Sequence, residues 1–149
     1  MITIDTLTDA DRPAWGRLAA GYKRFYNTPT TEAEYDEAWR RLRAGDGVHA
    51  FGARLAGPDG GELVGIVHYL FHTSTWAPTQ CYLQDLFTDP ALRGRGVARA
   101  LIEAVAQAAR ERGAARLYWL TQDHNTTARA LYDKVAAYKG FIRYDYPIA

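Results

Sequence analysis

Apolar residues recur along this chain at two different spacings, which predict where its helices and strands lie. Intervals of three and four residues predict helices. Thr8 and Asp11 offer an N-terminal cap for the first helix, and Thr31 with Glu34 forms the pattern of a capping box for the second. The predicted helices cover residues 15–22, 31 to about 43, 94–112 and 125–136.

Alternating or continuous apolar stretches between turn residues predict the strands. A tight loop at residues 57–61 joins two of them, and the stretch at 115–121 is apolar on both faces, which is typical of a strand inside a sheet. The predicted strands cover residues 2–4, 48–56, 62–72, 82–87, 115–121 and 141–146. This order of elements indicates an α+β fold with a mixed sheet covered by helices. Because no repeat, linker or low-complexity tract interrupts it, we expect one domain over residues 1–149.

Composition narrows the class of protein. A chain of 149 residues with 48% hydrophobic and 23% charged residues is typical of a globular domain and not of a disordered segment. A net charge of +1, with basic and acidic residues intermixed, indicates no surface for nucleic acid. Cys81 is the single cysteine, and the sequence shows neither a leader nor an apolar run of membrane-spanning length. We therefore expect a soluble, cytoplasmic protein that binds no membrane.

A glycine-rich loop follows the strand that ends before Pro90. Its sequence is Arg93-Gly94-Arg95-Gly96-Val97-Ala98, and it leads directly into a predicted helix. Helix N-termini carry unpaired N–H groups, and glycines let the backbone approach a phosphate. A pyrophosphate is therefore the expected ligand, although such glycines can also serve only to form a turn. The pattern is neither a P-loop, which needs Lys-Ser or Lys-Thr, nor a dinucleotide fingerprint, which needs a small residue where Arg99 stands.

This loop has the form Arg-x-x-Gly-x-Ala and resembles the coenzyme A-binding motif of the GNAT superfamily of N-acetyltransferases. A second segment, Asn125-x-x-Ala-x-x-Leu-Tyr132-x-Lys, is similar to another motif of that family. The resemblance implies a GNAT-type fold, with a central mixed, mostly antiparallel sheet flanked by helices, and acetyl-CoA as the acetyl donor. It implies contacts to coenzyme A from Leu86, Phe87, Thr88, Arg93, Gly94, Arg95, Gly96, Val97, Ala98, Asn125 and Tyr132.

The resemblance also implies catalytic roles. Tyr132 would protonate the leaving thiolate as the general acid, and main-chain groups of residues 86–88 would bind the carbonyl oxygen. Both polar residues of the second motif have structural interpretations as well. Asn125 suits a helix N-cap, and Tyr132 shares a helical stripe with apolar residues, as core tyrosines do. Because Tyr132 follows the glycine-rich loop at the spacing found in the family, the resemblance favours its catalytic interpretation.

The general base is less determined by sequence. Where the family's spermidine/spermine enzymes have a glutamate, this chain has Gln84. We therefore predict that the neighbouring Asp85 accepts the proton of the amine, directly or through water. The alternatives are His68, His72 and His124, and the spacing of the histidines does not indicate a metal site.

The expected acceptor is a primary amine, either on a small molecule resembling a polyamine or on a lysine side chain. Candidate residues for binding it are Tyr22, Phe25, Tyr26 and Gln84, with Trp76 as a further aromatic residue. An acidic cluster in the second helix would also attract a cationic amine. Its members are Glu32, Glu34, Asp36 and Glu37. Acids in a first helical turn are more simply explained by the helix dipole.

Two functional classes stay open at this point. The chain is either an acetyl-CoA-dependent N-acetyltransferase, which Tyr132 favours, or a non-catalytic coenzyme A-binding regulatory module, which Gln84 favours. The long segment between Tyr132 and Gly140-Phe141 resembles the polyamine and histone acetyltransferase-like branch, whose members often form dimers. The aromatic ending at 141–148 would leave an unprotected strand edge, so we expect a homodimer. The alternative is a strand folded into the chain's own sheet.

Overall fold

The computed structural model describes residues 1–57 and 61–149. The tight loop predicted at residues 57–61 therefore lies largely outside the described residues. The remaining chain forms two compact units, Met1–Trp119 and Leu120–Ala149.

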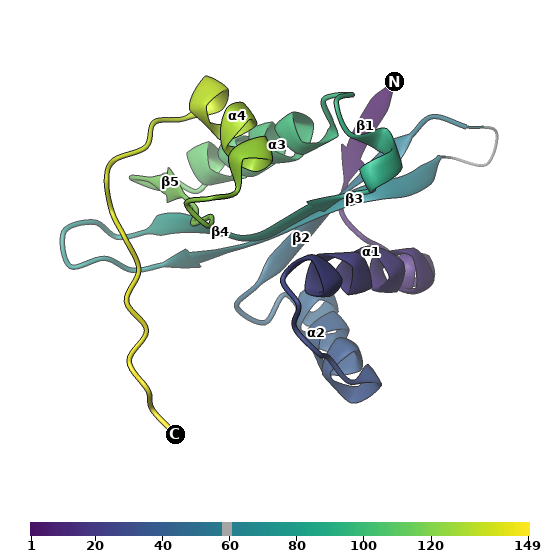
Figure 1. Cartoon of the computed structure of the whole chain (residues 1–149), viewed down its shortest axis with the longest axis horizontal. Coiled ribbons are helices and arrows are strands. Elements are labelled where there is room, and N and C mark those ends of the chain that lie inside the picture. Colours follow the sequence, from purple (N-terminus) through teal and green to yellow (C-terminus); the bar gives the residue numbers. More distant parts are fainter. Residues whose placement is uncertain (58–60) are drawn as a thin grey trace. The chain divides into compact units, whose positions relative to one another are not determined.

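The first unit contains a five-stranded sheet in the order β1-β2-β3-β4-β5 (Figure 1). The strands are β1 (Ile2–Asp5), β2 (His49–Leu55), β3 (Glu62–His72), β4 (Gln80–Thr88) and β5 (Leu117–Tyr118). The pairings of β1 with β2, β2 with β3 and β3 with β4 are antiparallel, and β4 pairs with β5 in parallel. The prediction of a mixed, mostly antiparallel sheet is therefore confirmed.

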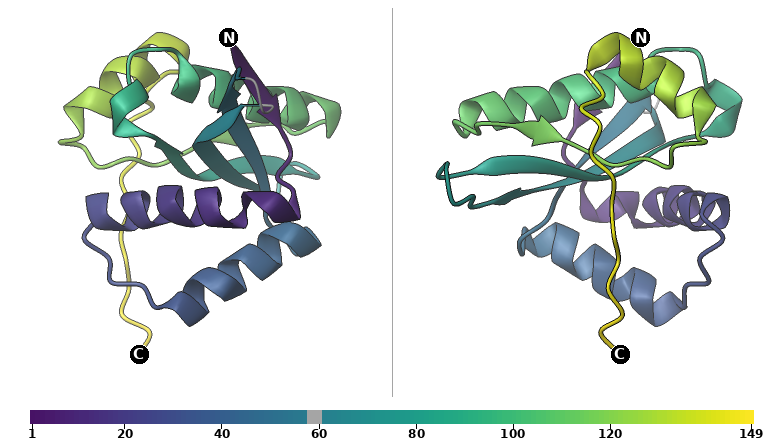
Figure 2. Two further views of the ribbon diagram at one scale, coloured as in Figure 1. Left: turned by 90° about the vertical axis from the view of Figure 1, so that its right-hand side faces the viewer. Right: turned by 60° about the vertical axis from the view of Figure 1, so that its left-hand side comes forward.

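Helices cover both faces of this sheet. Figure 2 shows α1 (Arg12–Phe25) and α2 (Glu32–Ala44) on one face and α3 (Val97–Glu111) on the other. The predicted capping box begins α2: Thr31 Oγ1 accepts from the Glu34 N–H at 3.2 Å, and the Thr31 N–H donates to Glu34 Oε1 at 3.1 Å. The helix ends where Gly45 takes a left-handed conformation with φ of 63°. Local sequence signals thus determine both ends of α2.

The two faces have separate cores. On one face, Val97, Leu101 and Val105 of α3 are buried against the sheet. Gly65 of β3 permits this approach, because a Cβ there would lie 2.8 Å from Val97. On the other face, a cluster around Trp15 of α1 joins the helices to the sheet, and it contains Leu7, Trp15, Leu18, Ala19, Leu63 and Ile66.

A β-bulge in β4 changes which face its side chains occupy. His68 pairs with Asp85, but Tyr69 pairs with Leu83, so Gln84 is an extra residue without a partner in β3. Before the bulge, Leu83 lies opposite Tyr69 on the α3 face. After it, Asp85 lies opposite His68 on the face of α1 and α2. The bulge therefore directs the Asp85 side chain toward these two helices.

Two strand predictions are wrong. The stretch at 115–121 forms only the two-residue strand β5, which lies at the edge of the sheet and not in its interior. No strand forms at 141–146, since the described residues of this segment have neither helix nor strand. A strand needs a neighbour whose backbone and side chains it can pair with, and Leu120–Ala149 contains no other strand.

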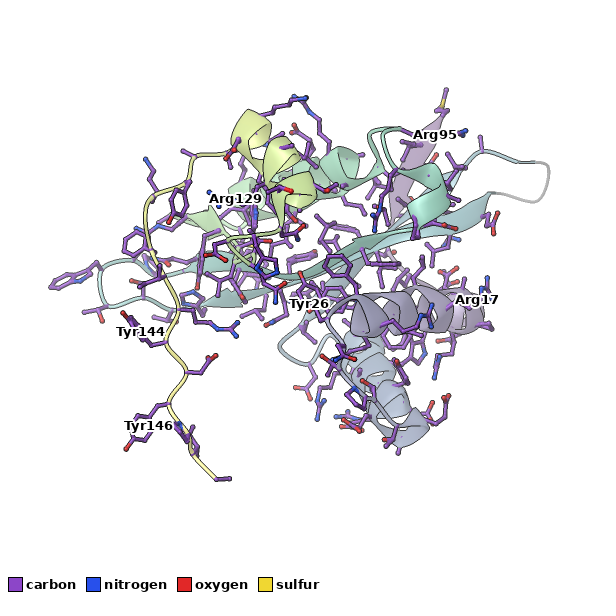
Figure 3. All side chains as sticks on the ribbon, viewed as in Figure 1. Arg17, Tyr26, Arg95, Arg129, Tyr144 and Tyr146 are labelled. Atoms are coloured by element: carbon purple, nitrogen blue, oxygen red, sulfur yellow. The ribbon has the colours of Figure 1, made fainter. Side chains whose placement is uncertain are left out.

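The second unit contains one helix, α4 (Thr126–Val135), which confirms the last predicted helix within one residue at each end. Asn125 is its N-cap, because its side-chain oxygen accepts from the Ala128 N–H at 3.5 Å. Figure 3 labels Tyr144 and Tyr146 on the extended segment that follows. Within the described part of the chain, no helix is long and apolar enough to cross a membrane.

Candidate active site

A cleft of about 460 Å³ lies on the face of the sheet that α1 and α2 cover. Both helices and the strands β3 and β4 contribute to its walls. The lining residues are Trp15, Ala19, Tyr22, Lys23, Thr30, Glu34, Tyr35, Glu37, Ala38, Arg41, Ile66, His68, Asp85 and Phe87. A concave site with an apolar wall and a few converging polar groups is the usual form of a small-molecule site.

Helix α1 directs one stripe of side chains into this cleft. Trp15, Ala19, Tyr22 and Lys23 stand at helical intervals, so they share the face that packs on the sheet. Trp15 is 1% exposed and packs against Trp39 of α2, with ring centroids 5.2 Å apart. This packing joins α1 to α2 and anchors the inner wall of the cleft.

A chain of hydrogen bonds crosses the cleft from α1 to β4. The Trp15 Nε1–H donates to His68 Nε2 at 3.0 Å. Because an indole nitrogen can only donate, His68 Nε2 must accept, and the proton of the ring is on Nδ1. Nδ1 lies 2.9 Å from Asp85 Oδ2 and donates to it. Trp15 therefore determines the tautomer of His68, and His68 holds the Asp85 carboxylate in place.

Asp85 is an ionised group on the sheet side of the cleft. Burial opposes its ionisation, but hydrogen bonds from His68 and Tyr22 and the positive charge of Lys23 outweigh burial and lower its pKa. Burial and the Asp85 charge raise the pKa of Tyr22 far above its ordinary value. The Tyr22 hydroxyl therefore stays protonated and donates a hydrogen bond to Asp85. The same two causes raise the pKa of Tyr26.

The acidic residues of α2 already have partners. Glu32 and Asp36 bind Arg12 at 3.1 and 2.9 Å. Glu34 belongs to the capping box, and Glu37 binds Arg40 at 2.9 Å. These contacts fit the structural explanation of the cluster, in which the acids stabilise the start of α2 and its surface.

The glycine-rich loop has the backbone of an anion site. Gly94 and Gly96 have φ of 78° and 82°, and Gly96 is the N-cap of α3. The first backbone hydrogen bond of α3 runs from the Ala100 N–H to the Gly96 carbonyl at 3.0 Å, so the N–H groups of Val97, Ala98 and Arg99 precede the helix's own hydrogen bonds. Successive unpaired N–H groups at a helix N-terminus bind phosphate well. Figure 3 labels Arg95 on this loop ahead of α3.

One edge of β4 is open beyond its second residue pair with β5. The two strands pair only at Cys81–Leu117 and Tyr82–Tyr118. From residue 83 to Thr88, no strand of the described chain pairs with that edge. Main-chain groups at 86–88, the residues that the family resemblance assigns to the carbonyl oxygen, lie on this open part. Leu86 is opposite Val67, Phe87 faces α1 beside Gly21, and Thr88 is opposite Gly65.

The structure brings together some predicted substrate residues and separates others. Tyr22 lines the cleft beside Asp85. Phe25 is 52% exposed and stacks edge-on against Tyr26, Trp76 is 93% exposed, and neither lines the cleft. Gln84 is exposed on the bulge. His72 binds the Tyr118 hydroxyl at 2.7 Å, outside the cleft lining.

Sequence reasoning missed several residues of the cleft, among them Trp15 as the partner of His68 and Lys23 as a lining cation. The helical intervals that connect Trp15, Ala19, Tyr22 and Lys23 were the available signal, because a tyrosine assigned to the site implicates the residues on its own face.

The second unit carries the other motif. Asn125 caps α4 and also donates from Nδ2 to Thr121 Oγ1 at 3.3 Å. Tyr132 lies two turns further along the same helix and is partly buried. His124 is exposed beside Asp123. In neither unit do three or more described His, Cys, Asp or Glu side chains gather closely enough to hold a metal ion.

Comparisons with known proteins agree with this architecture. The sequence model of the "Acetyltransferase (GNAT) family" matches residues 12–138. The D-amino-acid N-acetyltransferase HPA3 of Saccharomyces cerevisiae is 32% identical over 136 residues, which are 91% of this chain and 84% of that protein. The thialysine N-epsilon-acetyltransferase of Caenorhabditis elegans is 38% identical over 88 residues, 59% of this chain and 52% of that protein. The match thus spans about half the length of the second relative.

Solved structures show the same fold. The structure of AAC(6')-Iy in complex with a CoA-containing bisubstrate analog has a TM-score of 0.84 and 18% identity, covering 100% of this chain and 99% of that one. The ribosomal-protein-alanine N-acetyltransferase of Brucella melitensis biovar Abortus 2308 has a TM-score of 0.81 and 23% identity, covering 99% and 100% of the two chains. At these identities the likeness establishes the architecture alone.

Proposed function

Because the chain belongs to the GNAT family of acetyltransferases, we propose that it transfers the acetyl group of acetyl-CoA to a primary amine held in the cleft. The observation that carries this proposal is the Asp85 carboxylate, which is ionised, oriented by His68 and Tyr22, and directed into a cleft large enough for a small molecule. An ionised carboxylate attracts the ammonium form of an amine and is placed to accept its proton.

The loop at residues 93–98 fits the pyrophosphate of coenzyme A. The N–H groups of the first turn of α3 precede the helix's own hydrogen bonds and would suit an anion, and the φ values of Gly94 and Gly96 disfavour any side chain there. Arg93 and Arg95 add positive charge. We assign Val97, Ala98 and Asn125 to the same cofactor by family resemblance, together with main-chain groups of Leu86, Phe87 and Thr88.

The residues divide the reaction between them. Acetyl-CoA, when bound, supplies a thioester whose carbonyl carbon the amine attacks. Asp85 holds the ammonium and takes its proton, directly or through water, so that the amine has a lone pair for the attack. Backbone groups on the open edge of β4 bind the carbonyl oxygen as negative charge develops on it. By family resemblance, Tyr132 would give its proton to the sulfur as the carbon–sulfur bond breaks, and the second proton that the attacking nitrogen loses would return to Tyr132 through water.

A second candidate function is a regulatory module that binds coenzyme A without catalysis. Gln84 favours it, because the residue stands where polyamine enzymes of the family have a glutamate. The cleft on the acceptor side of Asp85 has no use in such a module, so the catalytic function is better supported. A homodimer, a cytoplasmic location and a single domain over residues 1–149 stay predictions from sequence.

The proposed function is tested by acetyl-CoA itself. At about 100 times its dissociation constant, it should stabilise the fold by roughly 2.7 kcal/mol, or on the order of 5 to 10 °C in melting temperature. Gly96→Asp should abolish this shift, because a carboxylate would occupy the space of a phosphate. The matched control is Gly113→Asp, where φ is 72° at the opposite end of α3 and the added Cβ meets nothing within 4 Å.

Turnover distinguishes the enzyme from the regulatory module. Free thiol should appear when acetyl-CoA is incubated with the protein and a panel of primary amines. A normal thermal shift without thiol release on any amine would favour the module. An unchanged melting curve at saturating acetyl-CoA would contradict both functions.

The role of Tyr132 has its own test. Tyr132→Phe removes the proton donor and keeps the ring, so turnover should fall about 10² to 10⁴-fold while acetyl-CoA affinity changes little. If the tyrosine only packs, the substitution should instead cost about 1 kcal/mol of stability and leave turnover near normal. Steady-state kinetics and thermal melts of the one variant therefore separate the two interpretations.

A further inference from the structure

The charges that line the cleft are not all available to a substrate. The lining contains three carboxylates and two cations, namely Glu34, Glu37, Asp85, Lys23 and Arg41. Glu34 accepts from both the backbone N–H and the hydroxyl of Thr31 in the capping box. Glu37 makes hydrogen bonds with Arg40 and an ion pair with Arg41 at 3.5 Å. Glu34, Glu37 and Arg41 therefore already have partners at the start or along the surface of α2.

Two opposite charges remain in the lining of the cleft, those of Asp85 and Lys23. Asp85 projects from β4 with His68 and Tyr22 as its partners. Lys23 projects from α1, and no carboxylate of the described residues lies within the 4.0 Å of an ion pair with it. The positive charge of Lys23 helps to lower the pKa of both Asp85 and Glu34, and Lys23 lines the same cleft as these two carboxylates.

This arrangement distinguishes between kinds of amine. A polyamine carries positive charge at both ends, and the end remote from Asp85 would meet the unpaired ammonium of Lys23. A lysine within a peptide has no carboxylate of its own near its amine. A free amino acid carries one negative and one positive group, which complement Lys23 and Asp85 respectively.

We propose that the acceptor is a free amino acid, whose carboxylate binds Lys23 while its amine binds Asp85. This proposal rests on the proposed acetyltransferase function and specifies its substrate class. It replaces the polyamine-like acceptor expected from sequence alone. The relatives named as D-amino-acid and thialysine acetyltransferases also take their names from amino acids.

The test compares acceptors that differ only in the carboxylate. Lysine and cadaverine form one such pair, and D-alanine and ethylamine form another. We expect kcat/KM, measured by thiol release, to be about 10- to 100-fold higher for the amino acid of at least one pair, because a charge-assisted contact is lost in its partner. Nα-acetyl-lysine amide represents a lysine in a peptide and should react as poorly as cadaverine.

Variants of Lys23 assign the preference to this residue. Lys23→Ala should remove most of the preference by raising KM for the amino acid much more than for its decarboxylated partner. Lys23→Glu should invert the preference in favour of cadaverine, and Lys23→Arg should restore it. Arg24→Ala is the matched control, because the neighbouring Arg24 is an exposed cation of α1 outside the cleft lining.

The outcomes separate this inference from the proposed function. Equal or better use of cadaverine and ethylamine by the native protein would overturn the amino acid acceptor while supporting the acetyltransferase. The same holds if Lys23→Ala lowers kcat/KM equally for both members of a pair. No thiol release with any of the five acceptors would count against the proposed function itself, and titration calorimetry of lysine into the protein with coenzyme A would then still test the Lys23 contact.

Discussion

The two faces of the sheet in Met1–Trp119 are built from one set of strands but differ in what fills them. On the α3 face, Leu101 and Val105 are 0% exposed, and the side chains that meet there are mainly apolar. On the opposite face, the core around Trp15 is interrupted by His68 and Asp85, whose hydrogen bonds lead into the cleft. Figure 2 shows α2 lying farther from the sheet than α1.

The difference shows how a small domain combines stability with chemistry. The α3 face is close-packed because Gly65 allows Val97 and Leu101 to approach the backbone of β3. The other face retains a cavity and the partly buried charge of Asp85, which a stable core alone would not favour. We therefore expect substitutions on the α3 face to lower stability and substitutions in the cleft to lower activity.

The largest expected effect comes from Asp85→Asn. The amide keeps an acceptor for His68 and the shape of the side chain, but it removes the charge that binds and deprotonates the amine. Turnover should fall about 10² to 10⁴-fold, whereas the free energy of unfolding should change by about 1 kcal/mol. Kinetics and denaturant titration of the variant measure both quantities. A large loss of stability with normal turnover would mean that this face does not differ from the other.

The pH dependence of the native protein also tests the role of the ionised Asp85 carboxylate. Because the folded-state pKa of Asp85 is lowered, its contribution to stability is present above the unfolded value of about 3.9 and is lost as pH falls through the folded value. Ionisation of Asp85 should therefore cause no acidic limb in kcat/KM above about pH 4.

Leu101→Ala on the α3 face should have the smallest effect on activity. It should show the opposite pattern to Asp85→Asn, namely a large loss of stability with near-normal turnover. Removing this buried side chain should cost about 2 to 5 kcal/mol through lost burial and the cavity left behind. At low temperature, the variant molecules that remain folded should have a KM for the amine and a kcat close to those of the native protein. An active-site titration with a tight bisubstrate inhibitor, followed by kinetics, would show whether the loss is confined to stability.

Local signals in the sequence were sufficient for part of this description. Thr31, Glu34 and Gly45 determine the ends of α2 through contacts within a few residues, and the loop at 93–98 has its φ angles because of its own glycines. The pairing of His68 with Asp85 depends on the register of two strands and on the bulge, neither of which periodicity reveals. The prediction of a strand at 141–146 was also wrong because a strand depends on a neighbour. Alternating aromatic residues do not supply the partner strand.

The bulge at Gln84 determines how different kinds of mutation at this position would affect the cleft. Its side chain is exposed, so most amino acids should be tolerated there, and a substitution library would score the position as unimportant. Loss of that single codon would be different in kind. With the extra residue gone, Leu83 would still lie opposite Tyr69 and Asp85 opposite His68, so Asp85 and Phe87 would keep their face of the sheet, but β4 would lose the bend and extra twist of the bulge. The deletion would therefore show whether the cleft needs only the face on which Asp85 lies or also the local bend of β4, which substitutions of Gln84 would not reveal.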